Sequence, residues 1–121
     1  MSTNTKAIAF LNDAYRADIG SSRNSYPDIK GKCTISTEIS SLSDIHVAEI
    51  IYRTQSFNGF DKYNDPNGEH KQGRFYYAAI AMDVVWEIHY YRDYFDKIPC
   101  EDPSDVSKTI RHLLITLAPR T

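Results

Sequence analysis

Residues 74–91, RFYYAAIAMDVVWEIHYY, decide the fold that we predict for this 121-residue chain. The stretch is dense in aromatic and β-branched residues, which favour strands, and a short connection around Met82 and Asp83 interrupts it. We therefore predict two strands, residues 74–81 and 84–91, that pair as an antiparallel hairpin. Side chains alternate between the two faces of a strand, so one face of the second strand is core and the other is at least partly exposed. The first face carries Val84, Trp86, Ile88 and Tyr90, and the second carries Val85, Glu87, His89 and Tyr91.

A helical pattern follows the hairpin. Asp102 and Pro103 are typical of a helix start, because proline fits the first turn and aspartate can cap it. An apolar stripe then predicts a helix that ends near Ala118. The stripe consists of Val106, Ile110, Leu113, Leu114 and Leu117.

Three further elements precede the hairpin. Apolar residues at helical spacing predict a helix over residues 6–17, capped by Asn4 or Thr5, and a second helix from Ser43 to about Ser56. Between them, one face of a half-buried strand is predicted by the alternation of Cys33, Ile35, Thr37 and Ile39. The order α-β-α-β-β-α predicts an α+β fold, with three helices on a small, mainly antiparallel sheet of about three strands.

The composition is typical of one globular domain that spans residues 1–121. Charged residues make up 25% and apolar residues 41% of the chain. No apolar run approaches the roughly 18 residues that a membrane span requires, and the polar start lacks a signal-peptide core, so we expect a cytoplasmic protein without membrane contact. Cys33 and Cys100 form no C-x-x-C pair, so we expect two free thiols and no zinc or redox motif. Cys33, in an alternating strand, is expected to be a small core residue.

The segment from Asn64 to Gly73, NDPNGEHKQG, is the main candidate for polar chemistry. Pro66 disfavours helix at the preceding residue and Asn67-Gly68 suits a turn with positive φ, so a tight bend is expected. Asp65, Glu69, His70 and His89 together supply ligand types for a divalent metal or groups for acid-base work. Their spacing matches no standard metal or catalytic motif, so we expect no metal and no cofactor, and a mainly structural role for this loop.

The aromatic residues point to a recognition surface. The chain has nine tyrosines, five phenylalanines and one tryptophan, and alternation cannot hide every ring of the hairpin on one face. Exposed tyrosines beside arginines are enriched at protein interfaces. We therefore predict partner-binding residues in and beside the hairpin, namely Lys71, Arg74, Tyr76, Tyr91 and Arg92.

Three segments in this order resemble a known family. They are residues 64–70 (NDPNGEH), 86–91 (WEIHYY) and 109–118 (TIRHLLITLA). Their order and spacing are similar to those of domain-of-unknown-function family 3768, small bacterial proteins associated with plasmids and integrated mobile elements. The resemblance implies no established activity. The chain carries different charges from the family pattern at Lys71, Glu87, His89 and Arg92, which favours a role for the surface over one for the loop carboxylates.

Three functions remain open at this point. The first is a non-catalytic protein-binding module that inhibits a bacterial defence system, of anti-CRISPR or antirestriction type. The second is a nucleic-acid-binding accessory protein in which aromatic rings stack on bases, although the net charge of −2 counts against it. The third is a small metal-dependent hydrolase built on Asp65, Glu69, His70 and His89. The expected partner is a protein such as a host defence complex, and a homodimer through an edge strand or the hairpin also stays open.

Overall fold

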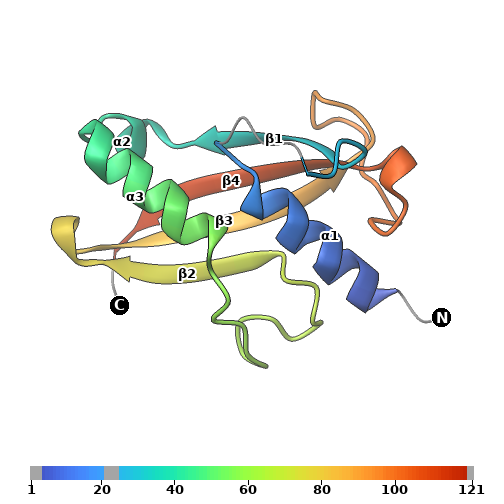
Figure 1. Cartoon of the computed structure of the whole chain (residues 1–121), viewed down its shortest axis with the longest axis horizontal. Helices are drawn as coiled ribbons and strands as arrows, with labels where there is room; N and C mark the ends of the chain where they lie inside the picture. The colour runs from blue at the N-terminus through green and yellow to red at the C-terminus, as the bar shows by residue number, and fades with distance from the viewer. Residues whose placement is uncertain (1–3, 21–24, 120–121) are drawn as a thin grey trace.

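The computed structural model describes residues 4–20 and 25–119 and shows an α+β fold (Figure 1). In this part of the chain, no helix is both long and apolar enough to cross a membrane. The helices are α1 (Thr5–Ala17), α2 (Thr37–Ser40) and α3 (Asp44–Gln55). The strands are β1 (Lys30–Ile35), β2 (Gln72–Tyr77), β3 (Met82–Tyr91) and β4 (Ile110–Ala118), and the short 3-10 helices are η1 (Ala78–Ile80) and η2 (Val106–Lys108).

The strands form one mixed sheet in the order β1-β4-β3-β2. The pairs β2–β3 and β3–β4 are antiparallel, whereas β1 lies parallel to β4. The prediction of about three strands in a mainly antiparallel sheet is therefore correct only at the level of the α+β class. The sheet has a fourth strand, and a parallel pair that no local pattern indicates.

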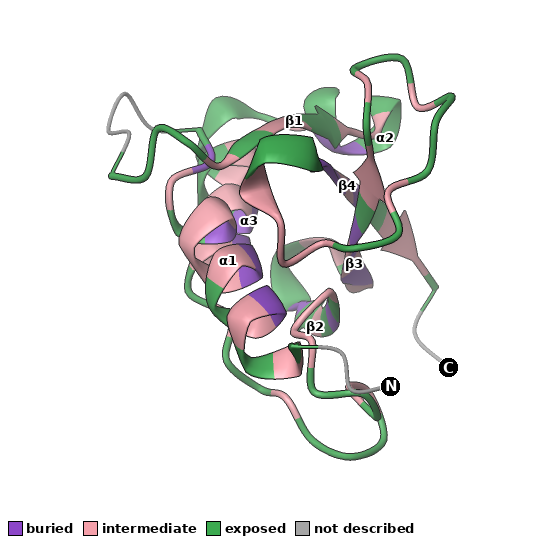
Figure 2. Ribbon diagram, turned by 90° about the vertical axis from the view of Figure 1, so that its right-hand side faces the viewer, coloured by how far each residue is buried: buried purple, intermediate pink, exposed green. Residues whose placement is uncertain are grey.

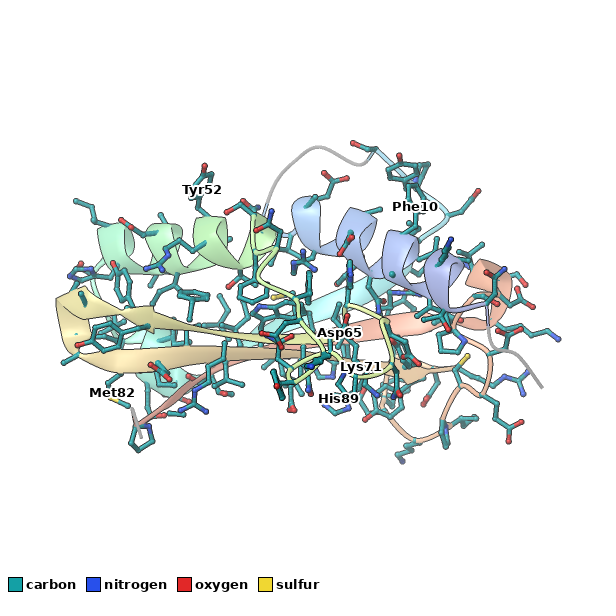
Figure 3. All side chains as sticks on the ribbon, turned by 90° about the horizontal axis from the view of Figure 1, so that it is seen from below. Phe10, Tyr52, Asp65, Lys71, Met82 and His89 are labelled. Carbon is teal, nitrogen blue, oxygen red and sulfur yellow. The ribbon has the colours of Figure 1, made fainter. Side chains whose placement is uncertain are left out.

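Helices α1 and α3 cover one face of this sheet, and the described residues place no helix on the other face (Figures 1 and 3). The core lies between the two layers, where buried residues are concentrated (Figure 2). Trp86 on β3 and Leu113 on β4 are fully buried there, and Ile50 of α3 packs against the same cluster. The register places Trp86 opposite Ile115 and Ile88 opposite Leu113, so the helix-covered side of β3 is the side predicted from alternation.

The hairpin and the two longer helices are confirmed. Strands β2 and β3 pair as predicted, but the connection is η1 and Ala81 rather than Met82 and Asp83. Ala81 has a φ of 53°, a left-handed conformation that lets the chain reverse immediately before β3. Helix α1 is capped by the side chain of Asn4, and Ser43 precedes α3 as predicted.

The prediction of a C-terminal helix is wrong. Asp102 and Asp105 accept hydrogen bonds from backbone amides two residues further on and form turns, and the apolar segment that follows is strand β4. Four consecutive residues from Ile110 to Leu113 are buried, because β4 is a central strand covered on both sides at this end. A continuous apolar run of this kind is common to central strands and buried helices, so its periodicity does not separate the two.

The prediction of a strand that reaches Ile39 is also wrong. Strand β1 ends at Ile35, and Ser36 caps α2 by accepting a hydrogen bond from the Ile39 amide at 3.3 Å. Ile39 is fully buried from this helix. Both cysteines are free, and Cys33 is exposed instead of being a core residue because β1 is an edge strand whose side chains are only partly covered.

Candidate functional site

The Asn64–Gly73 segment forms a corner that its own side chains hold in place. The Asn64 side chain accepts a hydrogen bond from the Asp61 amide at 3.0 Å and donates one to the Gly59 carbonyl at 2.9 Å. Gly68 has a φ of 72° and donates its amide to the Asp65 carbonyl, which completes the predicted turn. The polar groups at the start of the corner therefore stabilise its backbone conformation through hydrogen bonds.

His70 lies between two carboxylates at the end of this corner. Its Nδ1 is 2.9 Å from an Asp13 oxygen of α1, and its Nε2 is 3.7 Å from Asp65 Oδ2. The imidazole stacks on the Phe60 ring with centroids 3.9 Å apart, and Arg16 pairs with the same Asp13 at 3.3 Å. These contacts connect the corner to α1. They also place the Arg16 guanidinium next to the Asp13 carboxylate.

Glu69 belongs to a second, more deeply buried network under α1. The Tyr90 hydroxyl donates to Glu69 Oε1 at 3.2 Å and accepts from Asn12 Nδ2 at 2.8 Å. Asn12 in turn accepts from Arg111 Nε at 2.7 Å, and both of these side chains are fully buried. Burial raises the pKa of Tyr90 to about 12 and lowers the pKa of Arg111.

His89 does not join the loop carboxylates. It lies on β3 on the side of the sheet away from the helices (Figure 3), with its side chain 46% exposed and Glu87 as a neighbour at 3.8 Å. Within residues 4–20 and 25–119, no three His, Cys, Asp or Glu side chains are close enough together to hold a metal ion. The four residues considered for metal or acid-base chemistry are thus distributed over three separate environments.

The helix-free face of the sheet carries several of the predicted partner-binding residues. Arg74 and Tyr76 of β2 lie opposite Val85 and Asp83 of β3, on the face that bears His89. Lys71 precedes β2 and is half-buried beside Glu87 and His89. A shallow hollow between the two strands is lined by Asn64, Gln72, Gly73, Arg74, Val85 and Glu87.

Tyr91 and Arg92 lie at the far end of this face. Tyr76 lies opposite Asp83 on β3, and Tyr91 is eight positions further along the same strand. This spacing corresponds to about 26 Å along an extended strand. Tyr91 is half-buried and bridged to Pro99, whereas Arg92 is exposed. The five predicted residues therefore follow the length of β2 and β3 and do not form one compact cluster.

Residues 93–98, which we term the 93–98 loop, cover the same end of the helix-free face, directly after Tyr91 and Arg92. The Asp93 carboxylate accepts the amides of Lys97 and Ile98 at 3.0 Å each, and these bonds lower the pKa of Asp93. Lys32 of β1 donates to the Tyr94 carbonyl at 2.7 Å. Asp96 has a φ of 60° and is bound to the sheet through His112.

A further polar group, absent from the sequence prediction, lies beneath this loop. Thr34 Oγ1 of β1 is 2.7 Å from Nε2 of His112 on β4, and His112 Nδ1 is 2.9 Å from Asp96 Oδ2. His112 is only 7% exposed, while Thr34 is exposed. The sequence did contain a signal for this group, namely a histidine within the apolar run of residues 110–117. Because this run was predicted to be a helix, His112 was not expected to contact residues of a neighbouring strand.

Comparison with known proteins identifies a family and nothing more specific. The model of the family described as "Protein of unknown function (DUF3768)" matches residues 35–119, which run from the last residue of β1 past the end of β4. The resemblance inferred from the three sequence segments is thereby confirmed. Searches of curated proteins and of solved structures found no match.

Proposed function

The chain belongs to the DUF3768 family, and on this premise we propose that it is a non-catalytic protein-binding module that binds its partner through the helix-free face of the sheet. The observation that carries the proposal is the asymmetry of the two layers. Helices α1 and α3 cover one face of a four-stranded sheet, and within residues 4–20 and 25–119 the opposite face has no helical layer (Figures 1 and 3). A sheet of this kind can offer a flat surface that a second protein completes.

The side chains on this face support binding to a protein. Tyr76 is 37% exposed, and the side chains of Arg74 and Glu87 are each 44% exposed. Arg74 lies opposite Val85 and Glu87 lies opposite Leu114, and these two apolar side chains are partly buried. An apolar centre surrounded by polar and aromatic groups is the usual arrangement of a protein interface.

Nucleic-acid binding and metal-dependent hydrolysis have weaker support. The Arg74 guanidinium is already paired with the Asp83 carboxylate and donates to the Pro119 carbonyl at 2.9 Å, so the neighbouring negative charge offsets the attraction that a phosphate would meet there. For hydrolysis, Asp65 and His70 lie close together, but Glu69 and His89 face other environments.

The proposed partner is a host defence complex, and the protein would inhibit it in the manner of an anti-CRISPR or antirestriction protein carried by a mobile element. This part of the proposal rests on the family resemblance. The direct test is affinity purification of the full chain from a native bacterial host. We expect one protein complex at a fixed stoichiometry. Recovery of no stoichiometric partner would contradict the proposed function.

Substitutions on the two sides of the molecule test the surface. We expect Tyr76→Ala and Arg92→Ala to lower affinity for the recovered partner at least about 10-fold, a loss typical of interface anchors, without changing the free energy of unfolding by more than about 0.5 kcal/mol. Tyr52→Ala is the matched control, because Tyr52 is 65% exposed on α3, away from the sheet. Titration calorimetry gives the affinities. If Tyr52→Ala lowered the affinity as much as Tyr76→Ala and Arg92→Ala, the helix-free face would be excluded as the binding surface.

A further inference from the structure

The group Thr34, His112 and Asp96 has the connectivity of an activated hydroxyl. Asp96 Oδ2 is 2.9 Å from His112 Nδ1, and His112 Nε2 is 2.7 Å from Thr34 Oγ1. When the Nδ1 proton is donated to the carboxylate, Nε2 carries the lone pair and faces the hydroxyl proton. A carboxylate on one imidazole nitrogen and a hydroxyl on the other is the arrangement that generates a nucleophilic oxygen.

Burial and backbone geometry distinguish this group from ordinary surface contacts. His112 is 7% exposed, so its ring is held in one orientation, while Thr34 on the edge strand β1 is exposed to reagents from solvent. Asp96 has a left-handed φ of 60°, and backbone strain of this kind is concentrated at functional sites. Lys32 Nζ lies 3.4 Å from Asp96 Oδ2 and holds the carboxylate from a second side.

We propose that Thr34 is a nucleophilic hydroxyl that accepts an acyl group from an activated ester or thioester, with His112 as the general base and Asp96 as the residue that positions the imidazole. Thr34 Oγ1 forms a bond to the acyl carbon, and the bond from that carbon to the leaving group breaks. His112 Nε2 takes the hydroxyl proton and passes it to the departing alcohol or thiol. The products are an O-acyl Thr34 and the protonated leaving group, so no oxidant or other co-reactant is needed.

This reaction is independent of the proposed protein partner, because all three groups belong to the free chain. A single acyl transfer to Thr34 is a stoichiometric modification, which is compatible with a binding module that performs no turnover. The modified hydroxyl would lie on the same side of the sheet as the proposed binding surface, since Thr34 pairs with Leu114 of β4.

The test is acetylation of the full chain by p-nitrophenyl acetate. We expect one acetyl group per chain, located at Thr34 by peptide mass spectrometry, and a rate that rises with pH through a single ionisation. Thr34→Val should abolish this adduct and Thr34→Ser should retain it. His112→Gln should slow acetylation at Thr34 at least about 100-fold, the usual contribution of a general base, and should remove the pH inflection.

Two further variants keep the test decisive if His112→Gln fails to fold. Asp96→Asn alters a partly exposed loop residue and should also slow the reaction and change its pH profile. Thr116→Val is the matched control, because Thr116 is an exposed hydroxyl residue on the neighbouring strand β4, and acetylation of Thr34 should be unchanged in it. Acetylation that shows no preference for Thr34, or a Thr34 adduct that forms as fast in Asp96→Asn as in the unsubstituted protein, would overturn the proposal.

Discussion

Trp86 is the best example of a residue whose role follows directly from its position in a strand. It is fully buried, with Phe57 and Phe60 in edge contact at centroid distances of 5.5 and 6.0 Å and the Arg16 guanidinium 4.6 Å from its ring. Gly73 on the neighbouring strand leaves room for the indole, since a Cβ there would lie 2.5 Å from Nε1. Alternation alone placed Trp86 on the core side.

We predict that Trp86→Ala lowers the free energy of unfolding by about 3–5 kcal/mol, because it removes the largest of the fully buried side chains described and leaves a cavity. Glu87→Ala changes the adjacent residue, whose side chain is 44% exposed on the opposite face, and should change stability by less than about 0.5 kcal/mol. Urea unfolding followed by circular dichroism measures both. Similar losses for the two variants would contradict the assignment of the strand faces.

Strand β4 is the element for which local pattern and tertiary structure disagree most. Residues 106–117 carry apolar side chains at helical spacing, yet Ile110–Ala118 pairs with β3 on one side and with β1 on the other. At the end of β4 beneath the 93–98 loop, the four residues Ile110–Leu113 are buried on both faces, so this part of the strand lacks the alternation of a half-exposed strand. The pairing of β4 with β1 has no local signal in the sequence, because the paired residues are about 80 positions apart in the chain.

We predict that the backbone amides of the two inner strands, β3 and β4, exchange with solvent more slowly than those of the edge strands β1 and β2. The central residues Leu113 and Ile115 of β4 are fully buried, whereas β1 and β2 each have one unpaired edge. Hydrogen exchange of the native protein, resolved by NMR, measures the rates. Cross-strand NOEs between residues 33 and 113 should accompany this protection. A helical pattern of sequential NOEs over residues 106–117 would contradict the strand.

The candidate site shows the same division between local and distant information. The corner at residues 64–68 and its turn were predictable, because proline and Asn-Gly act on the backbone within a few residues. The separation of His89 from Asp65 could not be predicted, since it depends on the side of the sheet against which the corner packs. The contact between Thr34 and His112 was equally inaccessible, because it requires β4 to be a strand and to pair with β1.

The molecule as a whole contains tyrosines that remain protonated in the folded state. Burial raises the pKa of Tyr90 to about 12, and burial is also the main cause that raises the pKa of Tyr15 and of Tyr77. In the unfolded chain a tyrosine ionises near pH 10. The unfolded state therefore loses these protons first as the pH rises, and the stability that they contribute below pH 10 declines towards pH 12.

We accordingly predict that the free energy of unfolding decreases between about pH 10 and pH 12, with Tyr90 alone contributing a change of about 2 kcal/mol. Urea titrations at successive pH values measure the decrease, and absorbance at alkaline pH follows tyrosine ionisation. Tyr90→Phe keeps the ring but removes the titrating group, so its stability should fall less steeply over this range. The same slope in both proteins would show that Tyr90 does not contribute.

Local sequence patterns were sufficient to predict the hairpin, the side of β3 that forms the core, the two longer helices, the turn at residues 64–68 and the membership in DUF3768. These features depend on side-chain alternation, capping and turn chemistry, which act over a few residues, or on the order of the family's segments. The tertiary structure decided that residues 110–118 form a central strand, that α1 and α3 leave one sheet face without a helical layer, and that Thr34 meets His112. Each of these depends on contacts between distant parts of the chain, whose free energy outweighs local propensity.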